Sequence, residues 1–210
     1  MISKKRKAVW LLGVLLLLLA TTAFSQSTIK LTDVKCAVGK KATVKLQGPG
    51  DGIAGVNFTI TYDSAQLKNP IVSLGGLATG FTLEQNIPTA GELRAVIYND
   101  PVTTFGTGQG DIAIINFDID ITTEHCTNLV LDLADGTEPE KMGISDADGN
   151  SITSSYTFED GSILATIPGD FNADKAVNLT DFTLLVVGWG STYTLSDFTM
   201  LVAHWMMSCP

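Results

Sequence analysis

The sequence has 210 residues, of which 45% are hydrophobic, and its 13 basic and 22 acidic residues give a formal net charge of −9. This acidic balance argues against nucleic acid as a partner, because a surface that neutralises phosphates needs an excess of Lys and Arg. About 185 residues remain after a short amino-terminal segment that is described next, which is enough for one ordinary domain and a small module.

The first 25 residues follow the pattern of a secretory signal peptide. A basic cluster at residues 4–7 precedes an apolar run at residues 8–20, and Ala23 and Ser25 supply small residues at positions minus three and minus one. The run is shorter than the roughly 18 to 20 residues that a membrane-spanning helix needs. We therefore expect cleavage after Ser25 and an extracellular protein with a formal charge of −13 and no membrane span. An uncleaved amino-terminal anchor is the alternative.

Residues 27–166 alternate between apolar and polar side chains in short runs separated by turn residues, which predicts a mainly β domain. In the run from Ile112 to Ile121, one face carries Ala113, Ile115 and Phe117 while the other becomes polar halfway along. Many short strands in one domain favour a two-sheet β-sandwich of the jelly-roll kind. The expected strands are Thr28–Val34, Ala42–Gln47, Val56–Tyr62, Ile71–Leu74, Phe81–Gln85, Leu93–Tyr98, Ile112–Ile121, Leu129–Leu133, Ser151–Phe158 and Ser162–Ala165.

Three cysteines in an oxidising compartment permit one disulfide. Cys36 and Cys126 both lie in the predicted sandwich and are the expected pair, which leaves Cys209 unassigned. Three free thiols are the alternative, because the sequence does not give the Cα distance that a bridge requires.

Residues 168–210 form a second unit that repeats itself. The segments "LTDFTLLVVGW" from Leu179 and "LSDFTMLVAHW" from Leu195 match at a constant offset of 16 residues. Their apolar residues follow helical spacing, so we expect two helices that pack on each other.

The segment "GDFNADKAVNLTD" places oxygen ligands at the spacing of a calcium loop. Calcium takes six to eight hard oxygen ligands, which closely spaced carboxylates and carbonyls provide. The expected ligands, at loop positions one, three, five, seven, nine and twelve, are Asp170, Asn172, Asp174, the carbonyl of Ala176, Asn178 and Asp181. Lys175 stands at position six, where a glycine is usual.

The segment "GDFNADKAVNLTDFTLL" resembles the first repeat of a type I dockerin, in which Asp is usual at position twelve. The resemblance implies a calcium-dependent module that binds a cohesin through two similar faces. In this chain the 16-residue offset leaves no room for a second set of ligands, so we expect one calcium site and not an ordinary two-faced dockerin. The residues at the recognition positions, and hence the expected partner-binding residues, are Leu179, Thr180, Val186, Val187, Leu195 and Ser196.

The segment "GIAGVNFTITYDSAQLKN" from Gly52 is similar to a cohesin segment in which an apolar strand ends in Tyr-Asp, and "TFEDGSILA" resembles the last cohesin strand. These resemblances imply a secreted, non-catalytic scaffold protein of the cellulosome kind, working in polysaccharide catabolism, whose partners carry dockerins or cohesins.

Two alternatives stay open for the whole protein. One is a carbohydrate-binding module with an attachment tail, for which Tyr62, Tyr98 and Tyr156 would have to supply the aromatic surface. The other is a closed protein in which the tail packs on its own sandwich. A glycosidase would need two facing carboxylates, and the spacing of Glu84, Glu92 and Asp100 does not select any pair of them.

Overall fold

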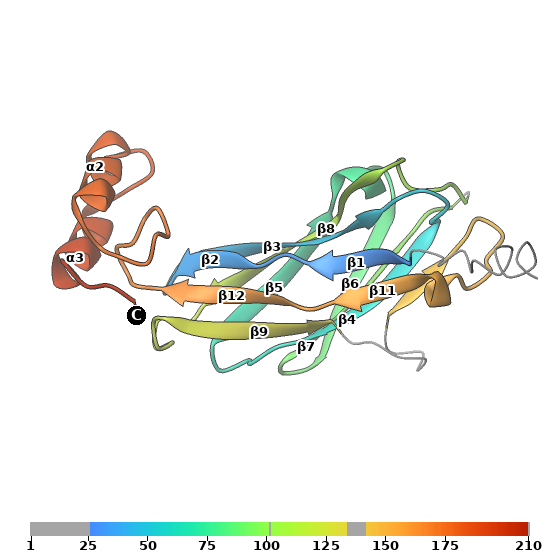
Figure 1. Ribbon diagram of the computed structural model, residues 1–210, viewed down its shortest axis with the longest axis horizontal. Coiled ribbons are helices and arrows are strands. Elements are labelled where there is room, and N and C mark those ends of the chain that lie inside the picture. The colour runs from blue at the N-terminus through green and yellow to red at the C-terminus, as the bar shows by residue number, and fades with distance from the viewer. Residues whose placement is uncertain (1–25, 101, 134–141, 210) are drawn as a thin grey trace, which may run out of the picture.

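The computed structural model describes residues 26–100, 102–133 and 142–209, which form a long β-sandwich with a helical tail at one end (Figure 1). The predicted signal peptide, residues 1–25, lies outside the described residues. Among the residues that are described, no helix is long and apolar enough to cross a membrane.

The strands are β1 (Ser27–Leu31), β2 (Val34–Ala37), β3 (Lys41–Pro49), β4 (Gly55–Thr61), β5 (Leu67–Leu74), β6 (Thr82–Thr89), β7 (Glu92–Tyr98), β8 (Gln109–Ile119), β9 (Thr127–Leu133), β10 (Gly143–Ser145), β11 (Tyr156–Glu159) and β12 (Gly161–Thr166).

Two sheets pack face to face, as the alternation predicted. One sheet has the strand order β11-β1-β3-β8-β5, and the other has the order β2-β12-β9-β4-β7-β6, with β10 paired to β4. The pairs β1–β11 and β2–β12 are parallel, whereas the strands on the long central ladders run antiparallel. The first and last parts of the sandwich therefore lie side by side and run in the same direction, so β12 ends at the end of the sandwich that carries the tail, opposite the start of β1 (Figure 1).

The expected strand Thr28–Val34 is in fact two strands, because the chain changes sheets inside it. Thr32 still bonds Lys45 of β3 through both its N–H and its hydroxyl, whereas the side chain of Asp33 accepts a hydrogen bond from Ser162 of β12 in the other sheet. The expected strand Ser151–Phe158 is also corrected: a short 3-10 helix, η2 (Thr153–Ser155), precedes β11. The switch of sheets also shifts the phase of the alternation, because Ile29 and Leu31 face the core from β1 whereas Val34 and Cys36 pack on it from β2.

The core lies between the sheets and is formed by the alternating residues of the central strands. Phe58 on β4 and Ile115 and Phe117 on β8 are fully buried, and Phe117 packs edge-on against Tyr62 with 5.2 Å between ring centroids. The apolar face predicted for β8 is confirmed. Ile121 is the exception, since it lies beyond the end of β8 and is exposed.

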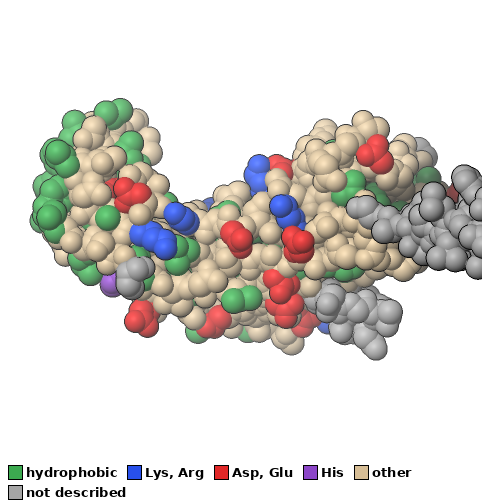
Figure 2. All heavy atoms as spheres, viewed as in Figure 1, with side chains coloured by type: hydrophobic (Ala, Val, Ile, Leu, Met, Phe, Trp, Pro, Cys, Tyr) green, Lys and Arg blue, Asp and Glu red, His purple; other side chains and the backbone are tan. Residues whose placement is uncertain are grey.

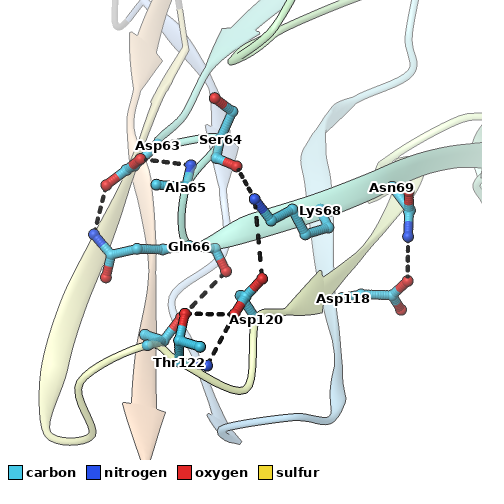
Figure 3. A network of polar contacts seen from close by, with 10 residues as sticks. Asp63, Ser64, Ala65, Gln66, Lys68, Asn69, Asp118, Asp120 and Thr122 are labelled. Carbon is cyan, nitrogen blue, oxygen red and sulfur yellow. Dashed lines mark hydrogen bonds and ion pairs between the residues drawn. The ribbon is translucent and has the colours of Figure 1, made fainter.

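A polar network closes the end of the sandwich where β5 begins and β8 ends (Figure 3). Asp63 accepts hydrogen bonds from the N–H of Ala65 and the amide of Gln66, and the backbone carbonyl of Gln66 accepts the N–H of Asp120. Lys68 lies 3.9 Å from Asp120, and Asn69 bonds Asp118. These contacts fix the "YDSAQLKN" turn against β8 at the end of the sandwich that carries the tail.

The tail contains a loop followed by helices α2 (Leu179–Val187) and α3 (Leu195–Ala203). Its small core consists of Ile167, Val177, Leu185 and Leu201. The carboxyl-terminal segment returns along the loop, because the N–H of Val177 bonds the carbonyl of Met207 and Ala176 bridges Ser208. Gly169 approaches the backbone of α3 so closely that a Cβ would lie 2.8 Å from the Cα of Leu201.

The disulfide expected between Cys36 and Cys126 is wrong. Cys126 is bridged to Cys209, with Cα atoms 5.4 Å apart, and Cys36 is free. Strand β12 lies between β2 and β9, so Cys36 and Cys126 flank Ala165 from opposite sides. Two strand spacings separate them by about 10 Å, which exceeds the roughly 7 Å that a disulfide can span. The bridge instead ties the end of the chain to the sandwich.

Candidate metal centre and partner surface

Three of the expected calcium ligands gather in the loop that joins the sandwich to α2. Carboxylate oxygens of Asp170, Asp174 and Asp181 all lie within 4.8 Å of one another. Asp170 and Asp181 are buried and Asp174 is exposed. Because like charges repel strongly when they are removed from water, such a group calls for a cation among the oxygens.

Backbone N–H groups hold the two buried carboxylates in place. Asp170 accepts hydrogen bonds from the N–H of Asp174 (3.1 Å) and of Lys175 (2.9 Å). Asp181 accepts the N–H of Phe171 at 2.7 Å with one oxygen and that of Asn178 at 2.9 Å with the other. The loop is thus wrapped around its carboxylates, and each side chain keeps lone pairs for a further partner.

Burial raises the pKa of Asp170 above its ordinary value, and this effect outweighs the N–H groups of Lys175 and Asp174, which act in the opposite direction. The negative charge of Asp181 raises the pKa of Asp170 further. A bound divalent cation would reverse this balance, because it favours the ionised form of every ligand carboxyl.

The backbone at position six has the conformation that a calcium loop requires, although glycine is missing. Lys175 has a φ of 77°, and Ala173 has a φ of 55°. The left-handed region is unfavourable for residues with a Cβ, by roughly 1 kcal/mol or more at each position. The surrounding contacts therefore hold Lys175 in this conformation at the expense of local stability.

The remaining expected ligands also lie on the loop, and the side chains of Asn172 and Asn178 already have hydrogen-bond partners. The amide oxygen of Asn178 caps α2 by accepting the N–H of Thr180 at 2.8 Å. Asn172 accepts the N–H of Asp174 and donates to its carboxylate. The N–H of Ala176 donates to Asp174. With three carboxylates, two amide oxygens and a carbonyl, the donor set fits a hard cation such as Ca²⁺.

The second repeat has the same helix start but no comparable group of ligands. Asp197 stands in α3 where Asp181 stands in α2, and both helices begin with a capping box. Within the described residues, Asp170, Asp174 and Asp181 are the one group of three metal-ligating side chains. Asp197 instead pairs with Lys40 of the sandwich.

The expected partner-binding residues lie together on the outer side of the tail. Leu179, Leu195 and Val187 are strongly exposed, with 68%, 69% and 81% of their surface accessible, and Val186 is more than half exposed. Thr180 and Ser196 are also exposed. Figure 2 shows hydrophobic side chains gathered at this end of the molecule. Trp189, Trp205 and Met206 of the tail are exposed as well, and the first two could have been found from the sequence because they close the repeated helical pattern.

The residues considered for other functions do not form a site. Glu84 bonds the hydroxyl of Tyr98, and Glu92 pairs with Arg94 at the far end of the same hairpin. Four residues along the ladder separate Glu84 from Glu92 by about 13 Å, which is too far for a glycosidase pair. Tyr62 and Tyr156 pack against the core, so they do not make an exposed platform with Tyr98.

Comparison with known proteins identifies the architecture of the sandwich. No protein-family model and no curated protein matches the chain. Among solved structures, the sixth cohesin of scaffoldin B from Acetivibrio cellulolyticus, in complex with a mutant Cel5 dockerin, is 17% identical with a TM-score of 0.55, over 67% of this chain and 99% of that chain. A non-cellulosomal cohesin from the archaeon Archaeoglobus fulgidus is 17% identical with a TM-score of 0.52, over 66% of this chain and 90% of that one.

A type I cohesin–dockerin complex from Clostridium thermocellum gives a TM-score of 0.56 at 16% identity, over 67% of this chain and 99% of the matched chain. The covered share of this chain is close to the share that residues 27–166 occupy. The cohesin resemblance of the segments that begin at Gly52 and Thr157 is therefore confirmed at the level of the fold. The sandwich has a cohesin-like fold.

Proposed function

We propose that this chain is a secreted, non-catalytic assembly protein that joins other extracellular proteins in polysaccharide catabolism. Its cohesin-like sandwich binds a dockerin on another protein, and its tail presents a second docking surface whose order depends on calcium. The observation that carries the proposal is the cohesin-like sandwich joined directly to a loop in which three carboxylates converge. The cohesins from Acetivibrio cellulolyticus and Clostridium thermocellum, which share this fold, were solved in complex with dockerins.

Calcium acts on the tail through the start of α2. An ion among Asp170, Asp174 and Asp181 neutralises their mutual repulsion and fixes the loop from which α2 begins. Asp181 acts both as an ion ligand and as a helix cap, because its carboxylate also accepts the N–H of Asn178 in the capping box. The first turn of α2 is thereby stabilised together with the ion site.

The tail is held on its own sandwich, as the closed alternative required. The disulfide between Cys126 and Cys209 and the ion pair between Lys40 and Asp197 both cross from one unit to the other. This attachment leaves the apolar outer side of α2 and α3 exposed, so another protein can still bind that surface. In our proposal, that surface binds a cohesin-bearing or similar extracellular protein, while the sandwich remains available for a dockerin.

A carbohydrate-binding role is the second candidate, because the sandwich carries a polar depression of about 660 Å³. Its lining includes Gln26, Thr28, Lys30, Gln47, Gln109 and Glu159, which can hydrogen-bond sugar hydroxyls. Among the residues that the structure describes, none that lines it has an aromatic ring on which a sugar could stack. Assembly is therefore the better supported function.

A capture experiment tests both proposals. The immobilised mature chain, residues 26–210, is incubated with secreted proteins in calcium and in chelator, and captured proteins are identified by mass spectrometry. We expect dockerin- or cohesin-bearing proteins. A Val187→Asp variant, which places a charge on the most exposed apolar side chain of the tail, separates the two surfaces: partners that it loses bind the tail, and partners that it keeps bind the sandwich. Co-sedimentation with insoluble polysaccharide and no captured protein would contradict the assembly role.

A further inference from the structure

The two repeats of the tail begin their helices with the same buried carboxylate. Asp181 in α2 accepts the N–H of Asn178, and Asp197 in α3 accepts both the N–H and the hydroxyl of Thr194. Asp181 and Asp197 are both buried. A buried carboxylate is costly unless a positive group compensates it, so each repeat needs a cation at the start of its helix.

The first repeat can collect side-chain ligands for a metal ion, but the second cannot. Positions 16 residues beyond Asp170 and Asp174 are occupied by Val186 and Gly190, which have no oxygen in their side chains. Asp197 is the single side-chain carboxylate that follows Asp181 in the sequence. One carboxylate does not make a calcium site, because calcium takes six to eight oxygens.

The sandwich supplies a cation to Asp197. The Nζ atom of Lys40 lies 2.5 Å from Oδ1 of Asp197. Lys40 belongs to the turn between β2 and β3, where its N–H bonds the carbonyl of Ala37 and its own carbonyl accepts the N–H of Ile119. Burial by itself would raise the pKa of Asp197, but the bonds from Lys40 and Thr194 outweigh it and hold the pKa below its ordinary value.

We propose that Lys40 takes the place of the missing calcium ion in the second repeat and fixes the start of α3 to the sandwich without any metal. One ammonium group balances the one carboxylate of the second repeat, whereas a divalent ion would offset two of the three carboxylate charges of the first repeat. It follows that α3 stays ordered in chelator, whereas α2 loosens when calcium is removed. The claim for α3 goes beyond the proposed function, because it holds whether or not the first loop binds calcium and whatever the tail binds.

Amide hydrogen exchange of the oxidised mature chain tests the role of Lys40. In chelator, the amides of α3 in the wild type should stay protected. Lys40→Met keeps the apolar stem but removes the charge, and we expect the α3 amides to exchange at least tenfold faster in this variant. The amides of β8, a strand that is far from the ion pair for most of its length, serve as the reference. Unchanged exchange at these amides shows that the sandwich remains folded.

Lys41→Met is the matched control. Lys41 is the next residue and loses the same charge, but it pairs with Asp118 of the sandwich at 3.6 Å, so α3 exchange should not change. Adding Asp197→Asn to Lys40→Met should recover part of the protection, because the uncompensated buried charge is then gone. Equal α3 exchange in the Lys40→Met and Lys41→Met variants, or loss of wild-type α3 protection on chelation, would overturn the proposal. Neither result would decide which proteins the chain captures, so the two proposals fail separately.

Discussion

The bridge between Cys126 and Cys209 gives the sharpest prediction about stability. Replacing both cysteines by alanine removes the cross-link and leaves no unpaired partner thiol. The bridge closes a loop with a sequence separation of 83 residues. In the chain-entropy model a loop of this size stabilises the folded state by about 4.5 kcal/mol at 25 °C. For a chain of this length each kcal/mol shifts the Tm by roughly 2–4 °C, so we expect the Tm to fall by roughly 9–18 °C.

Differential scanning calorimetry of the mature chain in calcium measures this shift. Cys36→Ala is the control, because Cys36 is free and only partly buried, and its Tm should fall by no more than about 4 °C. Peptide mapping without reduction should recover a peptide pair that contains Cys126 and Cys209. The reasoning is refuted if the double alanine variant melts with the wild type, or if Cys36→Ala gives the larger loss.

Three further predictions concern the loop and the free thiol. Asp181→Asn removes a ligand charge and leaves a single acceptor oxygen, which can cap the N–H of Asn178 but cannot also accept that of Phe171, so isothermal titration should show calcium affinity falling at least tenfold, while Asp148→Asn, outside the loop, leaves it unchanged. Lys175→Gly relieves a φ of 77° and removes a positive charge next to the ligands, so titration should show tighter calcium binding by several-fold, and weaker binding would contradict the assigned position six. Partial burial raises the pKa of Cys36 to about 11, so its alkylation followed by mass spectrometry should be slow at pH 7.5 and rise about tenfold per pH unit towards that value; rapid labelling at neutral pH would contradict the raised pKa.

In our proposals, calcium orders one half of the tail and Lys40 orders the other. The first half contains the carboxylate group and α2, and the second half contains α3, the ion pair and the bridged Cys209. The small core links them, because Leu185 of α2 and Leu201 of α3 both pack in it. We therefore expect calcium to change the order of α2 and its exposed residues without releasing the tail from the sandwich.

Features that depend on residues close together in the chain could be predicted from the sequence alone. Alternation along Ile112–Ile121 predicted which face of β8 is buried, because side chains alternate across a strand wherever it lies. The spacing from Asp170 to Asp181 predicted three converging carboxylates, since ligands within one short loop need no distant partner to meet. The matching segments from Leu179 and Leu195 likewise predicted two similar helices.

Features that join distant parts of the chain could be identified only from the tertiary structure. Cys126 pairs with Cys209 because β12 separates it from Cys36 and because the carboxyl-terminal segment returns along the loop. Lys40 pairs with Asp197 although 157 residues separate them in the sequence, and no sequence pattern shared by the two residues predicts the contact. Periodicity records which side of an element faces the core, but it carries no information about which elements become neighbours, and those neighbours fix the tail to the sandwich.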